Sequence, residues 1–209
     1  AGLGKIAKGA GLALAAVGAV GVGLGKNLFD AAVNVEAMGN KARVVFGEYF
    51  PAAQKTAEDL SASLGMSTTE VLGLTAGFGD LLTPMGFTQK QAQGMTDKMG
   101  YLTAALTQWS GGTKTAADVG DILADALTGE YDSLKSLGVQ LDAATVDAKM
   151  AAAGKSKLTG EAKKQAEAKI VLDEIYKQSS NAIAGYEKKT NKLGLAKNKL
   201  SSSLKNIRD

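Results

Sequence analysis

The spacing of apolar and polar residues predicts helices along most of this chain. Apolar residues recur three or four positions apart, and no segment sustains the two-residue alternation of a half-buried strand. We therefore expect an all-α fold, a helical bundle of short helices. It would have a Gly/Ala-rich apolar helix at the N-terminus and a coiled-coil-like helix at the C-terminus.

Local stop and start signals set the expected helix boundaries. Pro51 suits a first helical turn, and Gly65 suits the end of the same helix. Ser67 with Glu70 has the spacing of a capping box, which is repeated by Thr88 and Gln91, while Thr115 and Asp142 are further N-cap candidates. The expected helices span about residues 28–46, 51–64, 68–83, 89–109, 116–127, 130–137 and 143–153.

A longer helix is expected from Thr159 onward. Ala168, Val171, Leu172 and Ile175 share one helical face within it. Further on, a seven-residue repeat predicts a coiled-coil seam formed by Tyr186, Leu193, Leu200 and Ile207. A coiled coil also needs a second apolar position in each repeat, and the charged Lys197 interrupts that second set. The coil would therefore need partner strands to be stable. The alternative is a helix that packs on its own domain.

An uncharged run covers residues 9–25 between Lys8 and Lys26. As a helix it would span about 26 Å, slightly less than the ~30 Å hydrocarbon core of a bilayer. Gly21 and Gly25 form a small-xxx-small pair, with Gly18 about one turn earlier, so two such helices could approach closely. Two interpretations stay open: a membrane-active segment, or a segment that packs inside an assembly.

Charge divides the chain unevenly. The formal net charge is +3, but residues 1–148 carry 10 basic and 15 acidic side chains, whereas residues 149–209 carry 14 basic and 6 acidic ones. A basic C-terminal arm could meet DNA or anionic lipid, although a solvated lysine-rich helix face explains the same pattern. We expect an apolar segment at 1–27, a helical domain at 28–153 and a basic arm at 154–209.

The composition excludes several kinds of chemistry. Histidine and cysteine are both absent, which removes the usual ligands of zinc, haem and iron–sulfur clusters and the partners of Ser-His-Asp or Cys-His nucleophiles. Glu130 and Asp132 lie two positions apart and would point in different directions on a helix. No enzyme activity and no cofactor are expected. Because the chain begins at Ala1 and ends inside a helical pattern, we expect a segment of a longer or processed polypeptide.

Four stretches that follow the apolar run in the sequence resemble segments of a known protein family. In chain order they are AMGNKARVVFGEYF (37–50), GFGDLLTPMGFTQKQA (77–92), ALTGEYDSLKSLGVQLDAATVDAKM (126–150) and AIAGYEKKTNKLGLAKNKLSSSLKNI (182–207). From residue 12 to 209 the chain resembles tape measure proteins of long-tailed, siphovirus-like phages and prophages. The long repeated coiled-coil region of that family is not among these residues.

The resemblance implies a structural role in a virion. Family members lie as a homo-oligomer of three or six chains in the tail lumen and tip, after assembly in the host cytoplasm. Tail tube and tail tip proteins are their partners, and the helical length sets the tail length. They leave ahead of the DNA, and apolar segments such as residues 9–25 enter the host membrane. The alternative from another class is a pore-forming, bacteriocin-like helical module.

Overall fold

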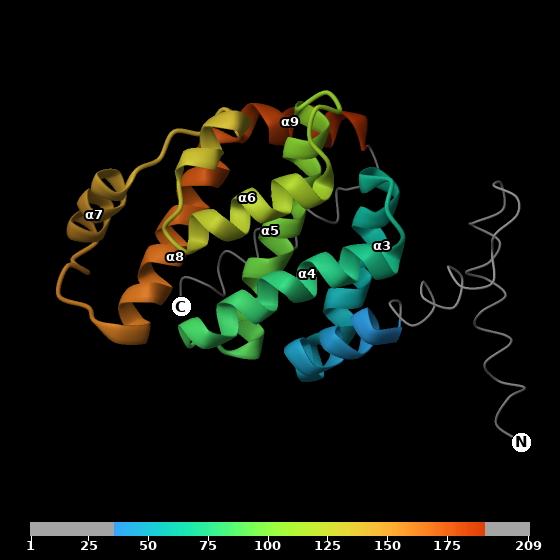
Figure 1. The fold of residues 1–209 in the computed structure, drawn as a ribbon, viewed down its shortest axis with the longest axis horizontal. Coiled ribbons are helices and arrows are strands. Elements are labelled where there is room, and N and C mark those ends of the chain that lie inside the picture. The colour runs from blue at the N-terminus through green and yellow to red at the C-terminus, as the bar shows by residue number, and fades with distance from the viewer. Residues whose placement is uncertain (1–35, 191–209) are drawn as a thin grey trace, which may run out of the picture.

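The computed structural model describes residues 36–190, and every regular element among them is helical. This confirms the expected all-α fold. Residues 36–46 form the first described helix. It is followed by η1 (Gly47–Tyr49), α3 (Phe50–Leu64), α4 (Thr68–Leu82), η2 (Thr83–Met85), α5 (Gln89–Trp109), α6 (Ala116–Leu127), η3 (Asp132–Leu137), α7 (Ala143–Ala152), α8 (Gly160–Gln178) and α9 (Ser180–Lys189), as Figure 1 shows.

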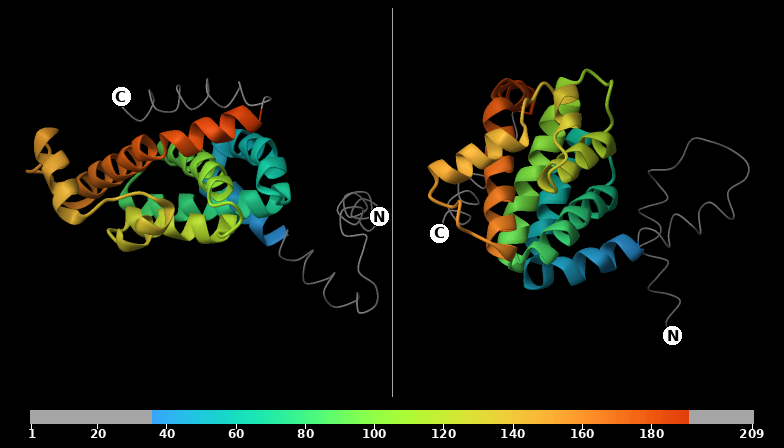
Figure 2. Two further views of the ribbon diagram at one scale, coloured as in Figure 1. Left: turned by 90° about the horizontal axis from the view of Figure 1, so that it is seen from above. Right: turned by 60° about the vertical axis from the view of Figure 1, so that its left-hand side comes forward.

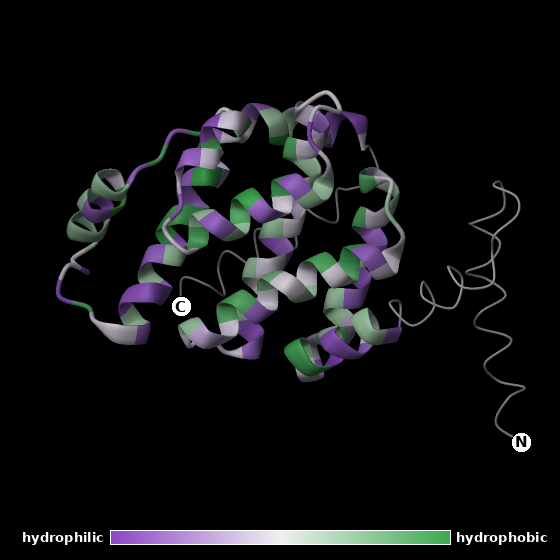
Figure 3. Ribbon diagram, in the orientation of Figure 1, coloured by the Kyte–Doolittle hydropathy of each residue, from purple (hydrophilic) through white to green (hydrophobic). Residues whose placement is uncertain are grey.

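Helix α5 is the centre of the bundle. Every residue from Lys98 to Leu106 is buried, which means that neighbours cover all sides of this helix. Helices α3, α4, α6 and α9 pack on it. Gly100 allows a close approach of α3, because a Cβ at this position would stand 3.1 Å from Cδ1 of Leu60. The other helices are amphipathic, and Figure 3 shows hydrophobic and hydrophilic residues alternating along them.

The capping signals define the helix starts as predicted. Ser67, Thr88 and Thr115 each accept a hydrogen bond from the backbone N–H three residues later and form complete capping boxes. Asp142 accepts from the N–H of Thr145 and caps α7. Gly65 ends α3 in the left-handed conformation, with φ of 65°, which costs glycine little. Each of these signals depends on neighbours within a few residues.

The long helix expected from Thr159 is divided, because Ser179 separates α8 from α9. The backbone bonds run through this kink: the N–H of Ser179 donates to Ile175 O, and the N–H of Ile183 donates to Ser179 O. Two adjacent serines, Ser179 and Ser180, are weak helix formers and suit a kink. Figure 2 shows α8 and α9 end to end along one side of the bundle.

The structure differs from the sequence interpretation at three further places. The segment bracketed by Gly129 and Gly138 is a 3-10 helix, and Tyr131 is its N-cap residue. Val44, an apolar residue of the helix expected at 28–46, is 80% exposed, because Ala42, Val45 and Phe46 form the buried face of this helix. The buried residues of α8 and α9 belong to the same hydrophobic core as those of α5. The expected 154–209 arm therefore begins as part of the bundle.

We expect a change of glycine to alanine to have opposite effects on stability at two positions of α4. A Cβ at Gly79 would overlap Cγ1 of Val45, whereas a Cβ at Gly77 would meet nothing within 4 Å. Val45 has a stiff branched side chain, so Gly79→Ala must displace the helix at 36–46 and should destabilise the fold by about 1–3 kcal/mol. Gly77→Ala should stabilise it by up to about 1 kcal/mol. Urea unfolding of both variants measures the change in the free energy of unfolding. A change of the same sign in both variants would contradict the packing of Val45 against Gly79.

Candidate functional site

A cluster of polar and aromatic side chains lies where α5 meets α8 and α9. We call it the α5–α8–α9 seam and define it by Lys98, Tyr101, Asp173, Tyr176 and Tyr186. Lys98 and Tyr101 come from α5, Asp173 and Tyr176 from α8, and Tyr186 from α9. Their helices bring together positions that are far apart in the sequence.

A buried ion pair forms the first half of the seam. The side chain of Lys98 is 2% exposed, and its Nζ lies 2.5 Å from Oδ1 of Asp173, a side chain that is 54% exposed. The same ammonium lies 4.9 Å from the ring centroid of Tyr176, in cation–π range. Burial lowers the pKa of Lys98, and the Asp173 carboxylate opposes part of this shift. The pair fixes α8 against the central helix.

Two tyrosines form the second half of the seam. The rings of Tyr101 and Tyr186 meet edge to face, with centroids 5.3 Å apart and planes at 86°. The Tyr186 and Ser63 hydroxyls are 2.6 Å apart, so α9 is joined to α3. Tyr101 Oη donates to Oε1 of Glu187 at 3.1 Å. Burial first, and then the Glu187 carboxylate, raise the pKa of Tyr101.

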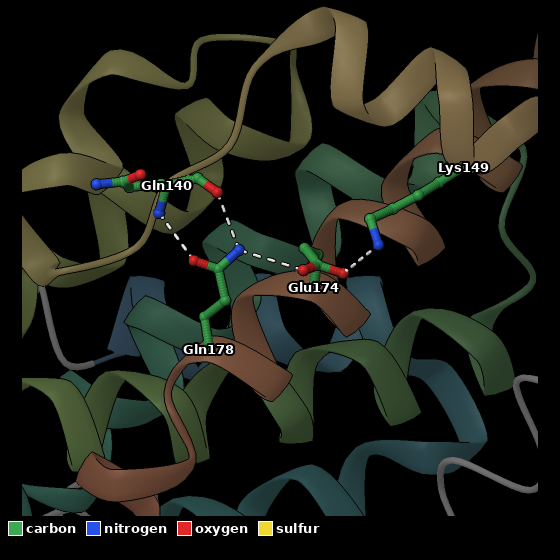
Figure 4. Close-up of polar contacts among 4 residues, drawn as sticks. All are labelled: Gln140, Lys149, Glu174 and Gln178. Carbon is green, nitrogen blue, oxygen red and sulfur yellow. Dashed lines mark hydrogen bonds and ion pairs between the residues drawn. The ribbon is translucent and has the colours of Figure 1, made fainter.

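A separate polar contact attaches α7 and its preceding loop to α8. Gln140 and Gln178 pair through two hydrogen bonds: the Gln140 N–H donates to Gln178 Oε1, and Gln178 Nε2 donates to the Gln140 carbonyl, both at 2.9 Å. Lys149 Nζ lies 2.8 Å from Oε2 of Glu174, and its hydrogen bond lowers the pKa of Glu174. Figure 4 shows the side chain of Gln178 reaching the backbone of Gln140, and the side chain of Lys149 meeting that of Glu174 on the same face of α8. Helix α7 itself lies at the edge of the bundle in Figure 1.

An open groove of about 650 Å³ lies beside this attachment, lined by residues between Gly129 and Thr145. Three of its charged groups serve local structure. Asp132 pairs with Lys135 at 2.8 Å, and Asp142 is occupied as the N-cap of α7. None of the seam residues is part of the lining of the groove.

The seam joins helices rather than presenting a reactive group. An ammonium that is 2% exposed and already paired is out of reach of a substrate in this conformation. Among residues 36–190, no three His, Cys, Asp or Glu residues are grouped in a way that could hold a metal ion. No helix in the same range is long and apolar enough to cross a membrane.

The predicted site residues fall into two groups. Gly18, Gly21, Gly25, Leu193, Leu200 and Ile207 lie outside the described residues. Tyr186, the first residue of the expected seam of the coiled coil, is 1% exposed in the bundle core. Its seven-residue spacing to Leu193 fits a core position as well as a coiled coil.

Lys98 is not among the site residues predicted from the sequence, although the pattern of its helix contains a signal. Lys98 follows Met95 by three positions and precedes Leu102 by four, so it lies on the apolar stripe of its helix. A lysine at such a position is buried with a partner or extends its ammonium to solvent. The partner, Asp173, is 75 residues away along the chain and could not be identified from local spacing.

Comparison with known proteins adds no relative: no protein-family model matches this chain, and no curated protein or solved structure matches it either.

Proposed function

We propose that this chain is a structural segment of a phage tail tape measure protein. It would occupy the tail lumen and tip as a homo-oligomer, contribute to tail assembly and length determination, and take part in genome ejection through the host envelope. The proposal depends most on the tract at residues 126–150, which follows the stretches at 37–50 and 77–92 in the order seen in that family.

The folded part is compatible with such a role. Its elements are short helices around a core rich in alanine, leucine and valine, joined by a seam of paired polar groups. The tract at 126–150 forms the end of α6, then η3 and α7, and α7 is attached to α8 through Lys149 and Glu174. These features support a structural role in which the folded segment fills space and packs against other helices.

The direct test is the composition of the particle. Mass spectrometry of purified virions from the phage or induced prophage that encodes the chain should detect its peptides in a few copies per tail. Absence of the peptides from intact, tailed particles would refute the proposal.

A pore-forming helical module is the second candidate, and the apolar run at 9–25 with a lysine at each end favours it. Dye release from anionic lipid vesicles separates the two functions. Strong release by the isolated full chain, with no companion protein, would favour the pore-forming module.

The apolar run also gives a prediction for infection. Leucine side chains at Gly21 and Gly25 would hold two close-packed helices apart. The double variant Gly21→Leu/Gly25→Leu should therefore keep the normal tail length and lose roughly tenfold in infectivity per particle, equivalent to about 1.4 kcal/mol in the delivery step. Electron microscopy and plaque counts measure the two quantities.

The matched control is Gly39→Leu, since a Cβ at Gly39 meets nothing within 4 Å. This variant should leave both tail length and infectivity unchanged. Altered tail length with normal infectivity in the Gly21→Leu/Gly25→Leu particles would show that residues 9–25 act in length determination instead.

A further inference from the structure

Trp109 is an exposed aromatic residue at the end of the central helix. It is the single tryptophan of the chain, and 58% of its surface is exposed although the rest of α5 is largely buried. The two other large hydrophobic residues exposed among 36–190, Met38 and Val44, lie on the first described helix. Among residues 36–190, Trp109 is therefore the one large aromatic side chain that is mostly exposed, and it lies beside α9.

The indole lies against a part of α9 that has small side chains. A Cβ at Gly185 would stand 3.8 Å from Cζ3 and 3.9 Å from Cε3 of Trp109. Ala184, the preceding residue, is exposed. We call Trp109, Ala184 and Gly185 the Trp109 surface. Small residues beside a large flat ring leave room for branched apolar side chains from another segment.

The chain itself supplies such a segment close by. Helix α9 ends at Lys189, and the N–H and hydroxyl of Thr190 both bond to the Tyr186 carbonyl. The end of α9 at Lys189 therefore lies about 6 Å along the helix axis from Gly185, at 1.5 Å per residue. Nineteen residues follow Thr190, enough to extend about 28 Å even as a helix.

The sequence of residues 191–209 suits an apolar surface. Leu193, Leu200 and Ile207 are seven residues apart, and Leu204 lies between the last two. These positions would share one face of a helix. Tyr186, the residue that would extend this stripe toward the bundle, is occupied in the core by Tyr101 and Ser63. The stripe that is left for another contact therefore starts at Leu193.

Tethering favours the chain's own segment over a second copy. A covalently attached segment is present at an effective concentration in the millimolar range for a short linker. A second copy must instead lose translational and rotational freedom on binding. We propose that residues 191–209 dock on the Trp109 surface of their own chain through Leu193 and Leu200. This inference is independent of the proposed role in a phage tail.

The single tryptophan makes the contact measurable by acrylamide quenching of fluorescence in the full-length chain. Leu193→Asp/Leu200→Asp should raise the quenching constant about twofold, in proportion to the indole surface that is uncovered. The control Asn198→Asp/Ser202→Asp adds the same charge at positions off the stripe and should leave the constant unchanged. Circular dichroism of both variants checks that the bundle stays folded.

The wild-type chain provides a second measurement that needs no variant. Its quenching constant should stay well below the value in urea and should not change on dilution through the micromolar range. A native constant at the level expected for an indole that is 58% exposed would overturn the proposal, because residues 191–209 would then add no cover to the ring. Protection that disappears on dilution would also overturn it and would identify a second copy as the occupant.

Discussion

Asp173→Asn should destabilise the fold by about 2 kcal/mol, because it removes the charge that compensates the buried ammonium of Lys98. Breaking a fully buried ion pair typically costs about 3–5 kcal/mol. The expected cost is smaller here since Asp173 is 54% exposed and an asparagine oxygen can still accept the hydrogen bond from Nζ. Thermal unfolding should show a decrease of about 4–8 °C in Tm for a chain of this size.

Lys98→Met is the matched control for this variant. Methionine fills a similar volume and removes the buried charge, so the variant should be close to neutral or more stable than the wild type. Asp173→Asn should then cost little in the Lys98→Met background. A loss of about 2 kcal/mol that persists in this background would show that Asp173 acts through another contact.

The same pair predicts a dependence on pH whose sign follows from proton binding. Burial lowers the pKa of Lys98 below its usual 10.5, so between the lowered value and 10.5 the unfolded chain holds more protons than the folded chain. The contribution of Lys98 to the free energy of unfolding therefore rises with pH across this window. Above about pH 10 the tyrosines oppose it, because burial raises the pKa of Tyr101, Tyr176 and Tyr186.

Subtracting the pH profile of the free energy of unfolding of Lys98→Met from that of the wild type isolates the contribution of Lys98. The difference in free energy of unfolding, wild type minus variant, should increase as the pH rises from neutral toward 10. A flat difference would mean that Lys98 titrates in the folded chain as it does in the unfolded one.

The sequence predicted helix starts well because each signal is complete within one turn. Ser67 with Glu70 specifies both hydrogen bonds of its capping box, and no distant residue is needed to form them. Gly65 likewise needs only its own freedom to adopt a positive φ. Such local features form independently of how the rest of the chain packs.

Burial was predicted less well, because it is decided by elements that are distant in the sequence. Val44 and Val45 are chemically alike, yet only Val45 faces α4, where Gly79 gives it room. Lys98 is buried because Asp173 and Tyr176 reach it from α8. Neither outcome follows from spacing alone, since the helical period limits which residues share a face but does not say which face meets a partner.

The kink at Ser179 has a similar origin. The weak helix formers Ser179 and Ser180 permit a change of direction, but packing on α5 makes it favourable. After the kink, Ile183 and Tyr186 are buried against the bundle, as expected for a helix that packs on its own domain, whereas the seven-residue repeat predicted a coiled-coil seam. The two interpretations predict different consequences for Tyr186.

Tyr186→Ala should destabilise the folded monomer by about 4 kcal/mol, which is in the range for truncating a buried aromatic residue. The side chain is 1% exposed. Its removal leaves a cavity and removes both the edge-to-face contact with Tyr101 and the hydroxyl contact with Ser63. Chemical denaturation monitored by circular dichroism measures the change, at concentrations low enough that self-association does not contribute.

Tyr186→Phe separates the hydroxyl from the ring. It keeps the edge-to-face contact and removes only the bond to Ser63, whose hydroxyl still donates to the Leu60 carbonyl at 2.8 Å. The expected cost is about 1 kcal/mol. A residue whose main role lies in a coiled coil between chains would behave differently: Tyr186→Ala would then weaken association in sedimentation experiments and leave the stability of the monomer unchanged. That result would contradict the core position of Tyr186 and favour the coiled-coil seam predicted from the sequence.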